Sequence, residues 1–172
     1  QDEERPDKIY RFLIQALRYG APVLDMLQLP EVCEIFRMCR NVRHENHLLT
    51  GFVRFSQTVE GVLVSRIGPK NDVLAILAPH FADRLPKESW IILDENRMKA
   101  AVHPSGGSWA IVHADGEGYL SAQLDRTTDQ EEYEALWKAF HETVAIGERY
   151  NPKCQRTHLA LRYRPYMTEF QK

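Results

Sequence analysis

The sequence predicts an α+β fold: an antiparallel sheet of about five strands with helices packed mainly on one face. Three observations support this prediction. Apolar residues recur at helical spacing near both ends of the chain. Short segments rich in β-branched and aromatic residues follow one another through the middle. Most of these segments are separated only by short turns, and short turns join antiparallel neighbours.

The first third of the chain is predicted to be helical. Residues 7–19 carry apolar side chains at helical spacing, and Gly20 follows as the stop. Pro30, a residue tolerated in the first turn of a helix, opens a longer helix that runs to about Leu49. Gly51 is expected to end this helix, because glycine adopts a positive φ without a steric penalty.

The middle of the chain supplies the predicted strands: 52–57, 61–67, 90–93, 98–103 and 108–113. The first two are expected to form one hairpin and the last two another. On the first strand, alternation places Phe52 and Arg54 on the same face. Asn71 is expected to cap a helix between the hairpins, and Pro79 to kink or restart it.

The last third is predicted to hold one long helix and a tail. Thr128 and Glu131 form a capping-box pattern before a continuous apolar face. The helix should end by Asn151, because Pro152 disfavours the helical conformation in the residue before it. Residues 156–170 are expected to dock as a tail with some helix. Four aromatic residues are expected in the core: Trp90, Trp109, Trp137 and Phe140.

The chain of 172 residues and 20.0 kDa is long enough for one well-buried core, and no linker divides it. We therefore expect a single domain over residues 1–172. Because the first residue is Gln1 rather than Met, we expect the chain to be a fragment of a longer protein. No apolar run approaches the roughly 20 residues that span a bilayer, which argues against membrane insertion.

Three cysteines without CxxC spacing argue against a disulfide framework and against a zinc cluster, and they favour a cytoplasmic location with buried or idle thiols. The net charge of −2 does not by itself indicate a polyanionic partner. The charges are segregated, however, with a basic tail after residue 149 and an acidic segment at 115–134. The tyrosines and arginines of the tail fit contacts to nucleic acid, and equally fit tyrosines that cover the core.

Side chains that could bind or react with a ligand are concentrated at residues 43–55, and further arginines follow up to residue 97. A guanidinium offers donors in a fixed fork that suits phosphate or carboxylate oxygens. If these arginines converge, they form an anion site; the alternative is that each pairs with a nearby acid. The candidate anion- or nucleic-acid-binding residues are Arg43, Arg54, Arg84, Arg97, Arg149 and Arg162, supported by Glu45, Asp94, Trp90 and Tyr163.

His47 and His80 are the candidate catalytic residues, since imidazole exchanges protons near neutral pH. The alternative for His44 and His47 is structural, because cations are favoured in the last turn of a helix. A metal would need a third ligand such as His80 or Asp94, and the histidine spacing differs from that of zinc proteases. We predict no metal and no cofactor, since phosphate-binding and dinucleotide-binding loops are also missing from the sequence.

Several blocks occur here in the order and spacing of one known family: Arg43-x-Glu45-x-His47-x-x-x-Gly51-Phe52-x-Arg54-Phe55, Ala78-Pro79-His80-Phe81-x-x-Arg84, Trp90-x-Ile92-x-Asp94-Glu95-x-Arg97, Leu136-Trp137-x-x-Phe140, Glu148-Arg149-x-Asn151-x-x-x-Gln155 and Leu161-Arg162-Tyr163. The chain thus resembles the bacterial "probable DNA metabolism protein" family, domain of unknown function 4130, from about Tyr10 to Phe170. It departs from the family pattern at Leu159-Ala160 and at Arg164, which weakens any role assigned to the tail.

The resemblance implies a link to DNA but no established reaction. Because family proteins usually carry additional sequence before this region, it also implies that the chain is the C-terminal part of a longer protein. Family members are associated with a radical S-adenosylmethionine protein of DNA modification or repair, and related domains are fused to uracil-DNA glycosylase-like domains. Our leading hypothesis is an accessory protein that binds nucleic acid or presents it to a partner enzyme. The first alternative is an enzyme acting on a phosphate- or nucleobase-containing substrate. The second is an interaction module for the radical enzyme.

Overall fold

The computed structural model describes residues 4–113, 136, 137, 139, 140, 143, 146, 148 and 151–170. The chain divides into two compact units, Gln1–Glu45 and Asn46–Lys172, and each is described by itself. The single domain expected from the sequence stays a prediction.

The first unit contains two helices and the start of a third. These are α1 (Arg5–Tyr19), the short 3-10 helix η1 (Ala21–Asp25) and the beginning of α2 (Pro30–Phe52). Gly20 ends α1 as predicted, with φ of 66° and with its N–H donating to the carbonyl of Ala16. The other predicted helix start, Pro30, is the first residue of α2.

The end of α2 differs from the prediction. The helix passes through Gly51 and includes Phe52, so Gly51 is not its stop and does not adopt positive φ. The N–H of Val53 still donates to the carbonyl of Leu49. The first strand is therefore much shorter than expected, and the alternation argument that paired Phe52 with Arg54 does not apply. Glycine costs a helix only about 1 kcal/mol, which tertiary contacts around Phe52 can offset.

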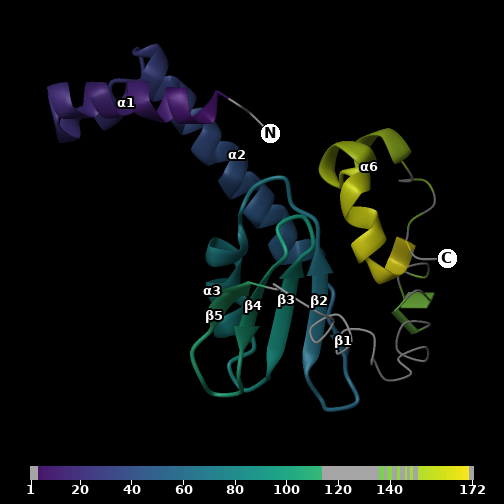
Figure 1. Ribbon diagram of the computed structural model, residues 1–172. Helices are drawn as coiled ribbons and strands as arrows, with labels where there is room; N and C mark the ends of the chain where they lie inside the picture. Colours follow the sequence, from purple (N-terminus) through teal and green to yellow (C-terminus); the bar gives the residue numbers. More distant parts are fainter. Residues whose placement is uncertain are drawn as a thin grey trace. The chain divides into compact units, whose positions relative to one another are not determined.

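The second unit contains a five-stranded sheet, which confirms the predicted α+β fold. Its strands are β1 (Ser56–Gln57), β2 (Leu63–Ile67), β3 (Trp90–Asp94), β4 (Lys99–His103) and β5 (Ala110–His113). They lie side by side in chain order, as Figure 1 shows. Three of the four strand pairs are antiparallel, whereas β2 and β3 are parallel. The parallel pair requires a crossover, which α3 (Leu74–Arg84) provides.

Helix α3 packs its buried residues against β3 and β4. It begins after Val73 without a side-chain cap, so Asn71 is not the cap that we expected. Pro79 lies inside a continuous helix rather than restarting one. A proline at this position removes one helical hydrogen bond and crowds the carbonyl four residues earlier, and the buried face formed by Leu74, Leu77 and Phe81 offsets this cost.

The core of the second unit is centred on Trp90, which is fully buried and stacks on His103 with ring centroids 5.0 Å apart. Trp109 is half-buried. Trp137 and Phe140 are 40% and 56% exposed, so the prediction that they belong to the core is wrong. Instead, the indole N–H of Trp137 donates to Glu169. The predicted capping box at Thr128 and Glu131 lies outside the described residues.

The C-terminal tail docks as predicted. It consists of α6 (Pro152–His158), η3 (Leu161–Tyr166) and η4 (Thr168–Phe170). The side chain of Asn151 caps α6 by accepting a hydrogen bond from the backbone of Cys154. Tyr163 and Met167 are buried, and η3 lies against β2.

Two further observations concern the whole described chain. Every helix in the described ranges is too short or too polar to cross a bilayer. The cysteines Cys33, Cys39 and Cys154 are free and exposed rather than buried.

Candidate anion-binding site

The last turns of α2 and α3 line an open pocket of about 390 Å³. We call it the histidine–arginine pocket; its lining residues are His47, Leu48, Thr50, Gly51, Phe52, His80 and Arg84. Both predicted catalytic histidines and one of the predicted anion-binding arginines therefore lie in one place, although they are separated by up to 37 positions in the sequence.

Helical geometry explains why these side chains share the pocket. Residues three and four apart lie on the same face of a helix, which groups His80 with Arg84 on α3 and His47 with Thr50 and Gly51 on α2. The hydroxyl of Thr50 donates to the carbonyl of His47. A Cβ atom built on Gly51 would meet no other atom within 4 Å, so this glycine adjoins open space.

The pocket is rich in nitrogen donors and has one permanent cation among its lining residues, Arg84. None of its described lining residues is acidic, and His47, His80 and Arg84 are all exposed. In the described part of the chain, no carboxylate forms an ion pair with Arg84. Because α2 and α3 both end here, their exposed carbonyls favour cations at these positions by about 0.3–1 kcal/mol each. Arg84 is thus favoured locally and is available for an anionic ligand, with His47 and His80 as further N–H donors.

Phe52 forms the aromatic part of the pocket and is held by the C-terminal tail. Its ring packs on Tyr163 at a centroid distance of 5.8 Å. Tyr163 is buried, and its hydroxyl accepts a hydrogen bond from Arg162 at 2.7 Å. The Arg162 guanidinium also lies over the Tyr163 ring. Tyr163 thus supports the pocket through its contact with Phe52. Arg162 is an exposed residue that does not line the pocket.

Arg54 has a structural role at the end of α2. Its guanidinium donates to the carbonyls of Gly51 and Val53 and forms an ion pair with Glu169 at 2.7 Å. The carboxyl side chain of Glu169 is only 5% exposed. Burial alone would raise the pKa of Glu169, but the hydrogen bond and charge of Arg54 lower that pKa below its ordinary value. Arg54 therefore ends the helix in place of a glycine cap and fixes the tail to it.

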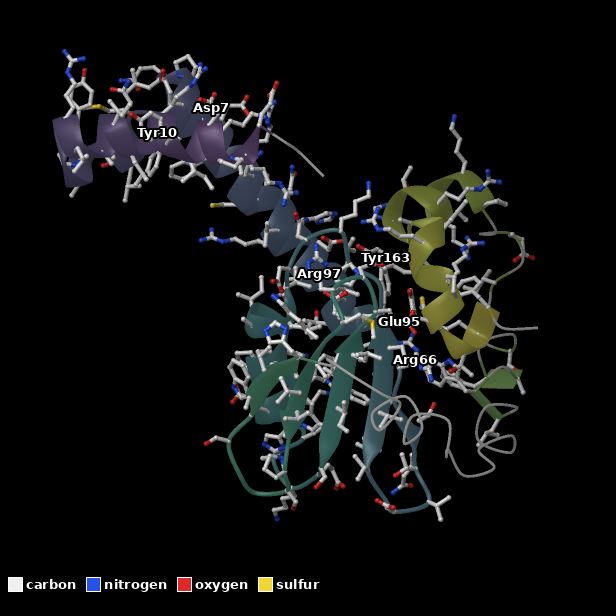
Figure 2. All side chains as sticks on the ribbon, in the orientation of Figure 1. Asp7, Tyr10, Arg66, Glu95, Arg97 and Tyr163 are labelled. Atoms are coloured by element: carbon white, nitrogen blue, oxygen red, sulfur yellow. The ribbon has the colours of Figure 1, made fainter. Side chains whose placement is uncertain are left out.

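Arg97 is also tied to a carboxylate. It donates to Asp94 at 3.0 Å and to the carbonyls of Pro69 and Lys70. Asp94 is fully buried at the end of β3, and burial raises its pKa despite the opposing hydrogen bond and charge of Arg97. Figure 2 shows Arg97 at this end of the sheet. The pair holds the loop after β2 against the turn after β3.

A second set of contacts there, which we call the tail contact, comprises Glu95, Tyr166 and Gly68. Sequence reasoning missed it. The Tyr166 hydroxyl donates to Glu95 at 3.1 Å, and Arg66 lies 3.5 Å from the same carboxylate (Figure 2). Burial and the neighbouring Glu95 raise the pKa of Tyr166. A Cβ atom on Gly68 would lie 2.5 Å from the Tyr166 oxygen, so the ring requires a glycine there.

The other predicted site residues lie elsewhere. Arg43 is exposed and Glu45 is buried, both in the first unit, and Trp90 is in the core of the second. Arg149 lies outside the described residues. Of the candidate arginines in the described residues, Arg84 alone lines the histidine–arginine pocket. The described residues contain no cluster of three or more potential metal ligands.

The fold and the pocket define an α+β protein with an arginine and two histidines gathered around an open cavity, a chemistry that suits an anionic ligand. The model of the family described as a domain of unknown function, DUF4130, matches residues 3–169. The chain therefore belongs to this family. Comparison with curated proteins and with solved structures finds no match.

Proposed function

We propose that this protein is an accessory factor of DNA modification or repair that binds a phosphate group of nucleic acid in the histidine–arginine pocket. One observation carries the proposal: His47, His80 and Arg84 line one open pocket that contains no acid among its described residues. The resemblance to a family linked with DNA metabolism supplies the identity of the anion.

The contrast among the arginines supports this choice of residues. Arg54 and Arg97 already have carboxylate partners, so a phosphate would have to displace Glu169 or Asp94 to reach them. A phosphate that binds Arg84 would displace no carboxylate among the described residues. Its planar fork can donate two parallel hydrogen bonds to phosphate oxygens, and each imidazole adds at least one N–H donor.

Backbone carbonyls at the ends of α2 and α3 repel an anion, so the side chains of the pocket must outweigh this repulsion. Each helix C-terminus is equivalent to about −0.5 of an elementary charge. Arg54 offsets the end of α2 by donating to the carbonyls of Gly51 and Val53, but the end of α3 still reduces the attraction that Arg84 exerts, so the donors of His47 and His80 are needed to strengthen binding. We therefore expect Arg84, His47 and His80 to bind the anion together rather than as three independent contacts.

The family resemblance also suggests the setting of this activity. We propose a cytoplasmic location and, as partners, the radical S-adenosylmethionine protein or a uracil-DNA glycosylase-like protein to which bound DNA would be presented. Co-purification of this chain with the radical enzyme, with and without nuclease treatment, tests the partnership. A complex that persists without DNA would instead favour the interaction-module hypothesis.

The direct test is binding to single- and double-stranded DNA across a salt series, using fluorescence anisotropy. We expect Arg84→Gln to weaken binding and to reduce the slope of log affinity against log salt by about 1, as loss of one phosphate contact would. The matched control is Lys87→Gln, which removes one exposed cation three positions away and outside the pocket. Equal losses in the two variants, or no binding at low salt, would contradict the proposal.

Two imidazoles in one pocket favour a second candidate, an enzyme acting on a phosphate- or nucleobase-containing substrate. His47 and His80 would then serve as general acid and base, with Arg84 holding the anionic group. Single and double His47→Ala and His80→Ala variants should lose turnover non-additively if the two act together. Turnover that is unchanged in the double variant would remove this candidate.

A further inference from the structure

We infer that the histidine–arginine pocket recognises a phosphomonoester, the terminal phosphate of a nucleic acid strand, in preference to an internal phosphodiester. This inference rests on the proposed function and narrows its ligand. Three features of the pocket carry it: its dimensions, the concentration of its donors and its aromatic wall.

The dimensions suit the end of a strand. At about 390 Å³, the pocket falls in the lower part of the range for small-molecule sites, roughly 300–1,000 Å³. Proteins that bind the interior of a strand instead use a groove with cations spaced along the backbone. Here the three donor side chains come from the ends of two helices and gather at one cavity.

The charges match a monoester better than a diester. A phosphomonoester carries about −1.5 to −2 charges near neutral pH and presents three strong acceptor oxygens. Arg84, His47 and His80 supply one guanidinium and two imidazoles, enough donors for all three oxygens. An internal diester has two free oxygens and a single charge. With less negative charge, it would gain less from the Arg84 guanidinium and from the imidazole donors.

The apolar side of the pocket can hold the nucleoside next to the phosphate. Phe52 and Leu48 line the same cavity as the three donors, and Phe52 is fixed by its contact with the buried ring of Tyr163. An aromatic side chain that is already held in position loses little conformational freedom when a base or sugar packs on it. The cavity therefore combines a phosphate end and a nucleoside end.

The test compares oligonucleotides of one sequence that carry a 5′-phosphate, a 3′-phosphate or only hydroxyl ends, in competition anisotropy with the full chain. We expect one phosphorylated end to bind about tenfold tighter than the hydroxyl form, as one additional charge-assisted hydrogen bond would give. The gain should disappear in Arg84→Gln, fall in His80→Ala and persist in Lys87→Gln. Circular dichroism of each variant verifies that it is folded.

The outcomes separate this inference from the proposed function. If all three oligonucleotides bind equally and Arg84→Gln weakens all of them, the pocket binds internal phosphates, and the preference for a terminal phosphate is wrong. If none binds at low salt, both proposals fail. A nucleoside monophosphate that competes as well as the phosphorylated strand would support the inference and identify a single nucleotide as sufficient.

Discussion

Arg97 and Arg84 stand in opposite situations within the same unit. Arg97 donates to a fully buried carboxylate and to two backbone carbonyls, whereas Arg84 lines an open pocket and has no ion-pair partner in the described chain. Their sequence contexts gave no reason to separate them, since both occur in blocks shared with the family. The comparison teaches that the carboxylate within reach of each guanidinium, rather than the arginine itself, decides whether it serves the fold or a ligand.

The largest expected effect is the loss of stability when Arg97 is replaced. Replacing it with glutamine leaves Asp94 buried without its cation, and we expect the free energy of unfolding to fall by about 3 kcal/mol in urea titrations. The control is Lys99→Gln, which breaks a more exposed pair with Asp72 and should cost less than about 1 kcal/mol. Similar losses in both variants would show that burial of Asp94 does not govern the role of Arg97.

The tail contact should give the next largest effect. In Gly68→Ala the new methyl group would overlap the Tyr166 ring, and we expect a loss of about 1–3 kcal/mol. The same substitution in a Tyr166→Ala background should cost much less, because the ring has been removed. A double-mutant cycle measures this difference, and a loss that is independent of Tyr166 would place the strain elsewhere.

The pair of Arg54 and Glu169 predicts a dependence of stability on pH. A carboxyl whose pKa is lower in the folded chain stabilises the fold above its ordinary value, here 4.5, and this contribution is lost as the pH falls. Glu169→Gln should therefore lower stability by about 1–2 kcal/mol at pH 7 and by less as the pH falls below 4.5. Unfolding curves at several pH values test this, and a difference that grew on acidification would have the wrong sign.

The smallest expected effect is a gain in stability rather than a loss. Gly51 lies in a helix without positive φ and beside open space, so Gly51→Ala should stabilise the chain by about 0.5–1 kcal/mol. A glycine that ended the helix with positive φ would instead make alanine destabilising. Thermal unfolding of this one variant thus distinguishes the structure from the prediction based on sequence.

The sequence predicted the helices and strands well where the signals were local. Gly20 and Pro30 mark helix ends by their own backbone preferences, and the five β-type segments all contain strands. It did not predict the end of α2, because the guanidinium of Arg54 and the ring of Tyr163 act there from outside the helix. Two hairpins were expected on either side of α3, and the parallel pairing of β2 with β3 was missed although a helix between them was predicted.

The candidate site was predicted in part for the same reason. His80 and Arg84 are four residues apart on one helix, a local relation that sequence can show. Their meeting with His47 depends on how α2 and α3 end, and the pairing of Arg54 with Glu169 joins positions 115 apart. Gly68 was the one hint at the tail contact in the sequence. A glycine is needed there because of the Tyr166 ring, which lies nearly 100 residues later in the sequence and close to Gly68 only in the folded chain.

The central claim is that Arg84 serves a ligand while Arg97 serves the fold. Its most direct test measures both the free energy of unfolding in urea and the affinity for DNA with the preferred phosphorylated end, in Arg84→Gln and in Arg97→Gln, under conditions in which both remain folded. We predict opposite patterns: Arg84→Gln keeps its free energy of unfolding within about 0.5 kcal/mol and loses affinity, whereas Arg97→Gln loses stability and keeps its affinity. Loss of affinity in Arg97→Gln with full binding in Arg84→Gln would contradict the account.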